Sequence, residues 1–170
     1  MVQRIWFERV FELGVPIEAH PDLVERLRGT PGRLAERTAD LDRAVLGSRR
    51  EGAWSIAEQA GHLSDLEQLW YGRVEDLIAG RPRLRDADLE NRATWDAHHE
   101  ERAIEDIVRE FAERRARLVG RLEGLTDAEL SATALHPRLE QPMTVVDLCF
   151  FVAEHDDHHL ATITSLRGGS

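Results

Sequence analysis

The chain has 170 residues, 42% of them hydrophobic and 32% charged, and these proportions predict a soluble globular protein rather than a disordered one. The formal net charge of −10 argues against nucleic acid as a partner, because phosphate binding needs a basic surface. The single cysteine, Cys149, excludes an internal disulfide, and the absence of lysine excludes Schiff-base chemistry and a Walker A lysine.

No apolar run approaches the roughly 20 residues needed to span a bilayer. The opening segment MVQRIWFERVFELG lacks the apolar core of a signal peptide. We therefore expect a cytoplasmic protein with no membrane partner. The length is most simply that of one domain, residues 1–170, which can bury a core without disulfides.

Helical periodicity dominates the chain, and strand-like alternation is hard to find anywhere along it. Pro21 is expected to open a short helix. Thr30 and Pro31 have the pattern of an N-cap and a first helical residue. They predict a longer helix that runs to about Leu46 and ends at Gly47.

A clearer helix start lies in the segment WSIAEQAGHLSDLEQLWYGRVEDLIAG. Ser55 and Glu58 have the spacing of a capping box, in which each side chain bonds the backbone of the other residue. Gly80 supplies the stop. Residues 81–100 are polar with weak periodicity, so we expect a long connection, and connections of this length in a small domain are commonly functional.

The second half begins with another long helical pattern over about residues 101–122. Thr126 and Glu129 have the spacing of a second capping box, which predicts a short helix. Residues 134–143 contain two prolines and are expected to cross the molecule as a loop.

Thr144 and Asp147 begin the last helix with a variant of the same box, and the helix is expected to end near Gly168. The chain therefore contains four long helical segments and one or two long crossings. The economical fold class is all-α, a four-helix bundle with short extra helices.

The last helix carries the most informative pattern, because its inward row places histidines where the hydrophobic period favours apolar residues. The row consists of Leu148, Val152, His155, His159, Ile163 and Leu166. Burying an unpartnered polar group costs roughly 1–3 kcal/mol. A divalent metal removes this cost, since neutral imidazoles at positions i and i+4 converge on one point.

A third ligand is then expected on a facing helix, and His62 lies on the inward row of the helix that starts at Ser55. Three histidines leave one coordination position open, which is typical of catalytic metal sites. Two alternatives remain: core histidines with satisfied hydrogen bonds, and a pairing of His155 with His158. A carboxylate-bridged di-iron site is set aside, because it needs two Glu-x-x-His pairs that the chain lacks.

These motifs resemble the DinB/YfiT-like family of metalloproteins. The resemblance rests on WSIAEQAGHL, with its capped start at Trp54 and Ser55 and its later histidine, and on HDDHHLATI near the C-terminus, with its H-x-x-x-H. It covers nearly the whole chain. It implies a four-helix bundle in which three histidines hold a divalent metal, often zinc, nickel or iron, and it implies a homodimer.

Carried over residue by residue, the ligands of the family are His62, His155 and His159. His158 falls where the family varies and is expected at the rim. The family often has glutamine three places after the last ligand, where this chain has Thr162. Characterised members use a low-molecular-weight thiol, as S-transferases or as a mycothiol-dependent maleylpyruvate isomerase, and the resemblance implies such a cofactor here.

Other residues are weaker candidates. Glu58 is a candidate base or ligand-orienting group, although the capping box is its simpler role. His98, in the loop ENRATWDAHH, is the best candidate for a loop residue that reaches the site, with a solvated histidine pair as the alternative. Asp156 and Asp157 are expected on the solvent side of the last helix.

The chain must grip any anionic thiol with arginines, because it has no lysine, and Arg73, Arg81 and Arg83 are the residues we expect to do so. Cys149 is predicted to be a buried thiol rather than a nucleophile. Three aromatic residues are expected in the core: Trp54, Trp70 and Phe111.

Three functions compete. The first is a divalent-metal-dependent enzyme acting on a small-molecule substrate, either a thiol-dependent S-transferase for small electrophiles or a metal-dependent hydrolase. The second is a non-catalytic, stress-associated protein whose metal site is closed. The third is an interaction bundle whose histidines are satisfied by acidic residues.

Overall fold

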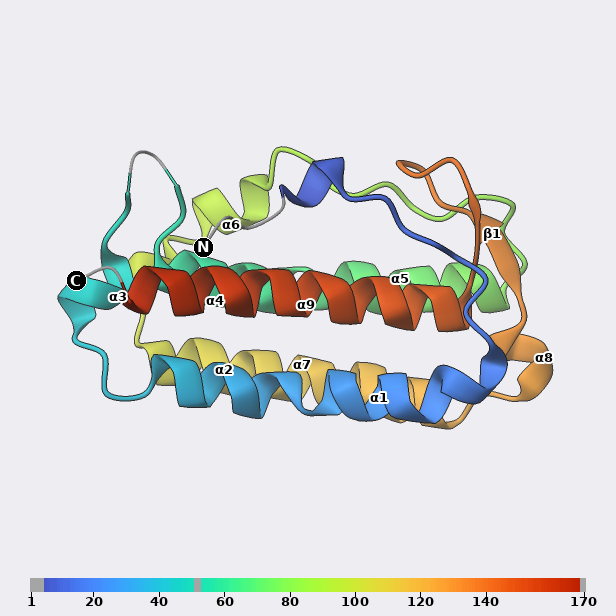
Figure 1. Cartoon of the computed structure of the whole chain (residues 1–170), viewed down its shortest axis with the longest axis horizontal. Coiled ribbons are helices and arrows are strands. Elements are labelled where there is room, and N and C mark those ends of the chain that lie inside the picture. Colours follow the sequence, from blue (N-terminus) through green and yellow to red (C-terminus); the bar gives the residue numbers. More distant parts are fainter. Residues whose placement is uncertain (1–4, 51–52, 169–170) are drawn as a thin grey trace.

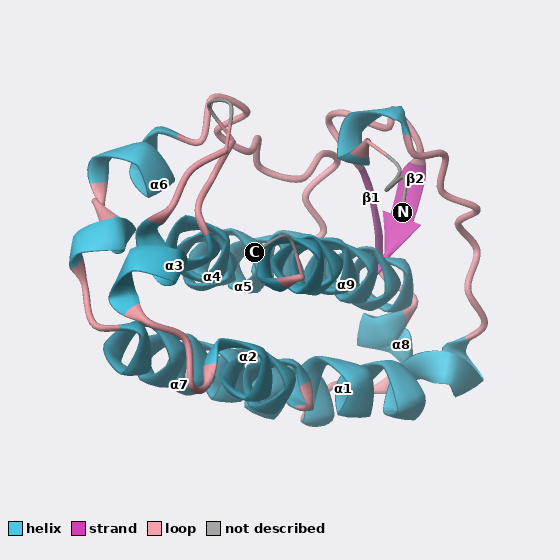
Figure 2. Cartoon of the chain, turned by 60° about the vertical axis from the view of Figure 1, so that its left-hand side comes forward, coloured by secondary structure: helices cyan, strands magenta, loops and turns pink. Residues whose placement is uncertain are grey.

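The computed structural model describes residues 5–50 and 53–168. The prediction about a signal peptide concerned the opening segment, and the first four residues of that segment lie outside the described residues. Four helical columns form a bundle of two layers (Figure 2). The columns are α1 (His20–Arg28) continuing into α2 (Thr30–Thr38), α4 (Ile56–Asp65) continuing into α5 (Glu67–Ile78), α7 (Ile104–Glu123), and α9 (Val145–Arg167). The predicted all-α bundle is confirmed.

One layer holds the α4–α5 column and α9, and the other holds the α1–α2 column and α7 (Figures 1 and 2). The layers pack through contacts of α4 and α5 with α7 and of α1 and α2 with α9. The other described elements are short: the 3₁₀ turns η1 (Trp6–Glu8), η2 (Ile17–Ala19) and η3 (His99–Glu101), the helices α3 (Arg43–Gly47), α6 (Arg92–Asp96) and α8 (Asp127–Leu130), and the strands β1 (Thr133–Leu135) and β2 (Pro142–Thr144).

Three segments cover the outer face of the layer formed by α4, α5 and α9 (Figures 1 and 2). We call residues 5–15, 81–103 and 133–144 together the roof. Asp147 at the start of α9 ties the first of these segments down, because its carboxylate accepts hydrogen bonds from the backbone N–H groups of Gly14 at 2.7 Å and Val15 at 2.9 Å. One side of α9 therefore faces the bundle interior and the other side faces the roof.

The local helix signals are confirmed. Glu58 accepts a hydrogen bond from the Ser55 backbone N–H at 2.9 Å, and the Ser55 hydroxyl accepts one from the Glu58 backbone at 3.3 Å. The box that begins with Thr126 is present at α8, and the box that begins with Thr144 is present at α9. Gly80 has a φ of +66° and ends the α5 column as expected.

The helix predicted over residues 30–46 is wrong in its second half. The chain leaves α2 after Thr38, Asp40 adopts a left-handed φ of +60°, and a separate helix α3 follows. Thr30 is also not a side-chain cap, because α1 continues through Gly29 and leaves no free helix start. Its hydroxyl donates instead to the carboxylate of Asp156 at 2.8 Å.

Two predicted loops contain regular structure. The 81–100 connection holds the short helix α6, and the 134–143 crossing is the inner part of a β-hairpin in which Ala134 lies opposite Met143. Leu135 also exchanges backbone hydrogen bonds of 3.0 Å with Pro82 and Leu84, so two roof segments are joined. Three-residue strands are too short to show alternation, which is why the sequence did not reveal them.

A charged triad lies inside the bundle. The Arg115 guanidinium on α7 contacts Glu67 Oε1 at 2.6 Å, Asp156 Oδ2 at 2.5 Å and the carbonyl oxygen of Leu27 at 3.0 Å. Arg115 is 1% exposed and Asp156 is fully buried. The prediction that Asp156 faces solvent is wrong, because α9 is buried on two sides, so that the step from position 155 to 156 turns from one buried side to the other.

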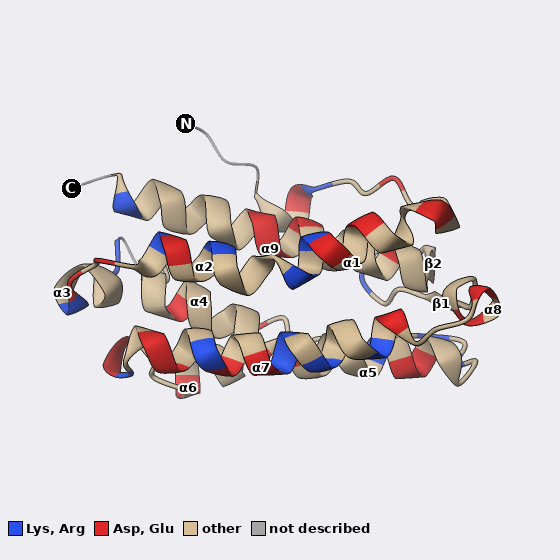
Figure 3. Cartoon of the chain, turned by 90° about the horizontal axis from the view of Figure 1, so that it is seen from below, with Lys and Arg blue, Asp and Glu red and all other residues tan. Residues whose placement is uncertain are grey.

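Acidic and basic residues are interspersed along α1, α2 and α7 on the face opposite the roof (Figure 3). Asp157 on α9 is half-buried and pairs with Arg26 of α1 and Arg33 of α2, so it joins the two layers. Exposed pairs of this kind contribute about 0–1 kcal/mol each. No helix among the described residues is both long enough and apolar enough to cross a membrane.

Candidate metal centre

Three histidines from two helices meet beneath the roof. His62 lies on α4, and His155 and His159 lie one turn apart on α9. One ring nitrogen from each lies within 4.8 Å of the others, and Nε2 of His155 is 3.1 Å from Nε2 of His159. All three side chains are buried. The structure thus brings together the three residues expected from the sequence.

The protonation states of this cluster suit a divalent cation. Burial lowers the pKa of His62 to about 4 and holds the pKa values of His155 and His159 well below their ordinary range. All three rings are therefore neutral at pH 7. Metal–nitrogen bonds of about 2.0–2.1 Å place two ligand nitrogens roughly 2.9–3.4 Å apart, and the separation of 3.1 Å lies within that range.

Two hydrogen bonds fix the tautomers of His62 and His159. Gln59 Oε1 accepts a hydrogen bond from His159 Nδ1 at 2.6 Å. Thr94 Oγ1 donates its own proton to Asp65 at 3.0 Å and lies 3.1 Å from His62 Nδ1, so it accepts from that nitrogen. Both rings consequently present the lone pair of Nε2 to the cluster.

His155 completes the test of fit. Its Nδ1 is buried and has no hydrogen-bond partner among the described residues. Its ring lies edge-on to Trp6 and Trp70, with centroids 5.0 and 5.5 Å away. His155 carries one proton, so at most one of the inward lone pairs of His62 and His159 finds a donor. A cation shared by the three rings removes this deficit, and the residues present fit a divalent metal.

A buried layer behind His62 supports the site. Asp65 accepts a second hydrogen bond, from Nε2 of His99 at 2.9 Å, and His99 and Thr94 are buried although both belong to the roof. Gly61 makes room for this ring, since an added Cβ there would lie 2.2 Å from the imidazole of His99. The roof is thereby fixed to α4 next to His62.

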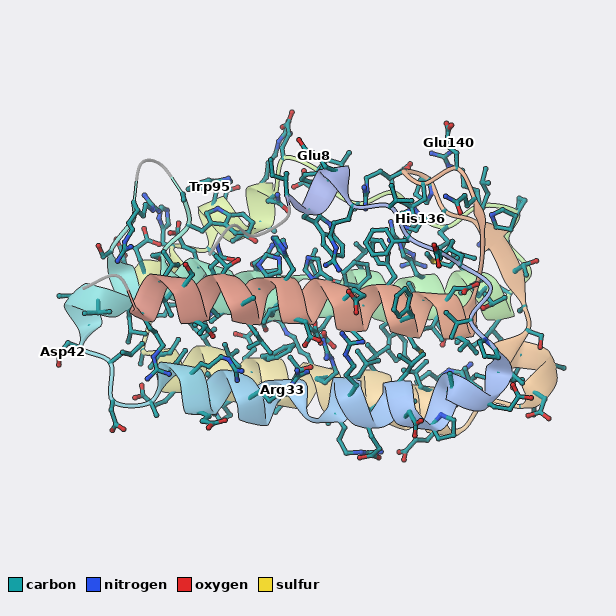
Figure 4. All side chains as sticks on the ribbon, viewed as in Figure 1. Glu8, Arg33, Asp42, Trp95, His136 and Glu140 are labelled. Carbon is teal, nitrogen blue, oxygen red and sulfur yellow. The ribbon has the colours of Figure 1, made fainter. Side chains whose placement is uncertain are left out.

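A cavity of about 410 Å³ lies between the roof and the helices, and all three histidines line it. Trp6, Trp54, Trp70 and Phe151 supply aromatic walls. Figure 4 shows Trp95 and His136 on the roof side of α9, toward different ends of that helix, and Arg33 on the opposite side. A cavity of this size and lining suits a small molecule.

The weaker candidates lie in different places. Both carboxylate oxygens of Glu58 bond Ser55 or Arg49, and Glu58 is not among the residues that line the cavity. His98 lies away from the three histidines, with a left-handed φ of 47° and a side chain that is 66% exposed, and it is not among the residues that line the cavity. His158 is half-buried at the cavity, with its ring 5.6 Å from Trp6.

Of the three arginines expected to grip an anionic thiol, one lies at the cavity. Arg73 is buried and lines the cavity, whereas Arg81 and Arg83 are exposed and do not. Arg83 is paired with Asp86 at 3.1 Å. The cavity receives its second arginine from Arg138 in the hairpin, which the sequence analysis missed because the segment was interpreted as a loop.

Burial raises the pKa of Cys149 to about 12, so the prediction of an unreactive buried thiol agrees with the structure. Trp70 and Phe111 are buried in the core as expected. The expectation for Trp54 is wrong, because its ring is half-buried and lies 4.6 Å from the ring of His62 in the cavity wall.

Four supporting residues were not identified from the sequence: Gln59, Asp65, Thr94 and His99. Two of them carried a usable signal, because Gln59 and Asp65 flank His62 at i−3 and i+3 and therefore share its helix face. The other two lie in a connection of irregular structure, where spacing does not indicate direction. Thr162, which stands where the family often has glutamine, donates its hydroxyl hydrogen to the carbonyl oxygen of His158 at 3.0 Å.

Comparison with known proteins agrees with this geometry. The sequence model of the DinB superfamily matches residues 26–163. The structure of YfiT from Bacillus subtilis, described as a probable metal-dependent hydrolase with an unusual four-helix bundle topology, superimposes with a TM-score of 0.80. That match covers 95% of this chain and 93% of YfiT at 22% identity.

A mycothiol-dependent maleylpyruvate isomerase superimposes with a TM-score of 0.67 at 12% identity, over 84% of this chain but 59% of its own. At these identities the two structural likenesses show the fold. No curated protein sequence matches the chain.

Proposed function

Because the chain belongs to the DinB superfamily, we propose that it is a divalent-metal-dependent enzyme that acts on a small molecule. His62, His155 and His159 are the residues we propose as metal ligands. The observation that carries the proposal is that three neutral, buried imidazoles converge at a cavity large enough for a substrate. A purely structural metal would need no such space.

A divalent ion held by three imidazoles supplies an open position at which the pKa of a water or a thiol falls toward neutrality. The chain contributes the rest of the site. Gln59 and Thr94 hold the rings of His159 and His62 in the tautomer that offers Nε2. The aromatic walls and the roof exclude bulk water from the reacting groups.

We propose water as the nucleophile, and thus hydrolysis. This choice is supported by the likeness to YfiT, a probable metal-dependent hydrolase whose whole length the chain nearly matches. A low-molecular-weight thiol is the second candidate, supported by the likeness to the mycothiol-dependent isomerase, of which the match spans 59%. Zinc, nickel and iron(II) all suit three neutral imidazoles.

The first experiment is mass spectrometry of metal in tag-free protein, with a His155→Ala, His159→Ala double variant beside it. We expect near-stoichiometric metal in the unaltered protein and its loss from the double variant. His98→Ala is the matched control, because this histidine is exposed and should leave the metal content unchanged. Absence of metal, with no change in melting temperature on adding it, would contradict the proposal.

A second experiment separates an enzyme from a protein that uses metal only as a folding staple. Cobalt(II) is substituted into the protein, and azide is added while the visible spectrum is recorded. An open coordination position predicts a spectral change on azide binding, whereas a closed site predicts none. An unchanged spectrum would favour the non-catalytic, stress-associated alternative.

Three expectations from the sequence stay predictions. We propose that residues 1–170 form one domain, and limited proteolysis should leave a single resistant core. We propose a homodimer, which light scattering during gel filtration should detect. The cytoplasmic location can be checked by fractionating cells that express the chain.

A further inference from the structure

A second polar cluster lines the same cavity. Arg73 on α5 is 2% exposed, and its Nη1 lies 3.0 Å from Nε2 of His136 in the hairpin loop. Arg138 follows in that loop, with its guanidinium over the rings of Phe7 and Phe151 at 5.4 and 5.8 Å. Arg73, His136 and Arg138 are called the arginine cluster below. The proposed metal ligands do not include any of them.

Among the described residues no carboxylate oxygen lies within 4.0 Å of either guanidinium of the arginine cluster, and the charge of Asp86 acts on Arg73 only from a longer distance. The cavity is lined by two acidic residues, Asp86 and Asp88, and both are exposed. Asp86 is paired with Arg83, and Asp88 accepts hydrogen bonds from backbone N–H groups of residues 90 and 92.

The cluster also has a surplus of hydrogen-bond donors. Nδ1 of His136 accepts from the backbone N–H groups of Arg138 and Leu139 at 3.2 Å, while its Nε2 faces the donor Nη1 of Arg73. A neutral imidazole has one acceptor nitrogen, so one of these contacts lacks an acceptor. Nη2 of Arg138 is buried without a partner among the described residues, whereas Nε and Nη2 of Arg73 donate to the carbonyl oxygen of Arg85 at 3.2 Å.

Both arginines keep their charge at neutral pH. Burial lowers the pKa of Arg73 to about 10, which is still well above 7. Burial and the neighbouring arginines lower the pKa of His136 to about 3, so this ring stays neutral. One buried and one half-buried cation, together with donors that lack acceptors, are costly without a counter-ion, and an anion would satisfy both needs.

We propose that the arginine cluster binds the carboxylate of the substrate, and that the substrate class is a small organic acid with an apolar middle. That the other end of the substrate reacts at the three histidines rests on the proposed function. The ring of Trp70 lies 5.5 Å from the ring of His155 and 5.5 Å from Cζ of Arg73, so the two ends are at most about 11 Å apart.

The apolar middle follows from what lies between the two ends. Phe151 stands 5.1 Å from the ring of His136 and 6.0 Å from that of Trp70, and both aromatic residues line the cavity. A short acid would therefore place its carboxylate on the guanidinium groups, its carbon skeleton against these two rings, and its reactive bond at the histidines. Charge-assisted hydrogen bonds supply the recognition.

The test uses benzoate and benzamide, which share a shape and differ in charge. Binding to metal-free protein is followed by calorimetry and by tryptophan fluorescence, so that no carboxylate can bind a metal instead. We expect benzamide to bind at least tenfold more weakly than benzoate. Arg138→Met and Arg73→Gln should each weaken benzoate binding at least tenfold, and Arg109→Met, an exposed control on α7 away from the cavity, should leave it unchanged.

The melting temperature of the Arg138→Met variant distinguishes a role in binding from a purely structural role. Arg138→Met removes a half-buried charge without an ion-pair partner, so the melting temperature of the variant should equal or exceed that of the unaltered protein. A lower melting temperature with unchanged benzoate affinity would overturn the proposal, as would equal affinities for benzoate and benzamide. If the purified protein contains no metal and still prefers benzoate to benzamide, the proposed carboxylate site is supported and the metal-dependent enzyme is refuted. If the purified protein contains metal and shows no such preference, the enzyme is supported and the carboxylate site is refuted.

Discussion

Replacing Arg115 by methionine tests the charged triad inside the bundle. The guanidinium makes three hydrogen bonds of 2.6–3.1 Å with Glu67, two of 2.5 and 3.1 Å with Asp156, and one of 3.0 Å with the carbonyl oxygen of Leu27. Methionine fills a similar space with no charge. It therefore leaves two carboxyl groups buried without a cation.

The magnitude follows from the proton that one carboxyl must take up. Bringing a glutamate with an ordinary pKa of 4.5 to its neutral form at pH 7 costs about 3.4 kcal/mol, at 1.36 kcal/mol per pH unit. The general cost of removing one partner of a buried pair is about 3–5 kcal/mol. We expect the free energy of unfolding to fall by that amount at pH 7.

The sign of the pH dependence is fixed by the same argument. In the variant the folded state holds a proton that the unfolded state releases above pH 4.5, so the folded state loses stability as the pH rises through that value. The cost of the substitution relative to the unaltered protein should therefore shrink when the pH is lowered from 7 to 5.

Urea unfolding followed by circular dichroism measures these differences. Arg109→Met is the matched control, because its guanidinium is exposed and pairs with Asp106 across one helix turn, and it should cost less than about 1 kcal/mol. Adding Glu67→Gln and Asp156→Asn to Arg115→Met should recover much of the loss. A cost below about 1 kcal/mol for Arg115→Met would refute the reasoning, because it would mean that the carboxylates are not desolvated.

Three further substitutions or treatments test the surroundings of the site. Gly61→Ala should destabilise the fold by about 1–3 kcal/mol in urea unfolding, because the added methyl group meets the buried ring of His99; an unchanged midpoint would show that the ring can move aside. Thr94→Val should weaken metal binding roughly 10–100-fold in a chelator competition, since His62 loses its acceptor, and equal affinity would contradict that role. Cys149, with its pKa raised to about 12, should resist iodoacetamide at pH 8 in the native protein and react after unfolding; rapid native labelling would show that the thiol is accessible.

Local chemistry made much of the fold predictable. The capping boxes that begin at Ser55, Thr126 and Thr144 are complete within four residues, so adjacent residues alone supply both partners of each hydrogen bond. Asp40 shows the limit of this approach. Its left-handed conformation breaks a run of helix-compatible residues, and nothing adjacent in the sequence marks the break.

The sequence predicted the arrangement of the candidate site correctly where the helical repeat determines which face of a helix carries a residue. It failed where a helix is buried on two faces, because burial then no longer distinguishes them. His155 and His159 could be paired because they are one turn apart. Asp156 was misplaced because the opposite side of α9 is also buried, against the arginine of α7. His98 and His99 are neighbours in an irregular segment, and only the three-dimensional path shows that the second is the buried one.

The division between roof and helices has a consequence for engineering. The proposed ligands lie on α4 and α9, whereas His136 and Arg138 lie in the loop that connects the two strands of the hairpin. The residues of that loop can be replaced together without changing either helix. Rebuilding residues 136–141 with other side chains should therefore retune which acid is accepted while the chemistry at the histidines is kept. Thr94 also belongs to the roof, but its hydroxyl contacts His62, so it must be kept unchanged when other roof residues are replaced.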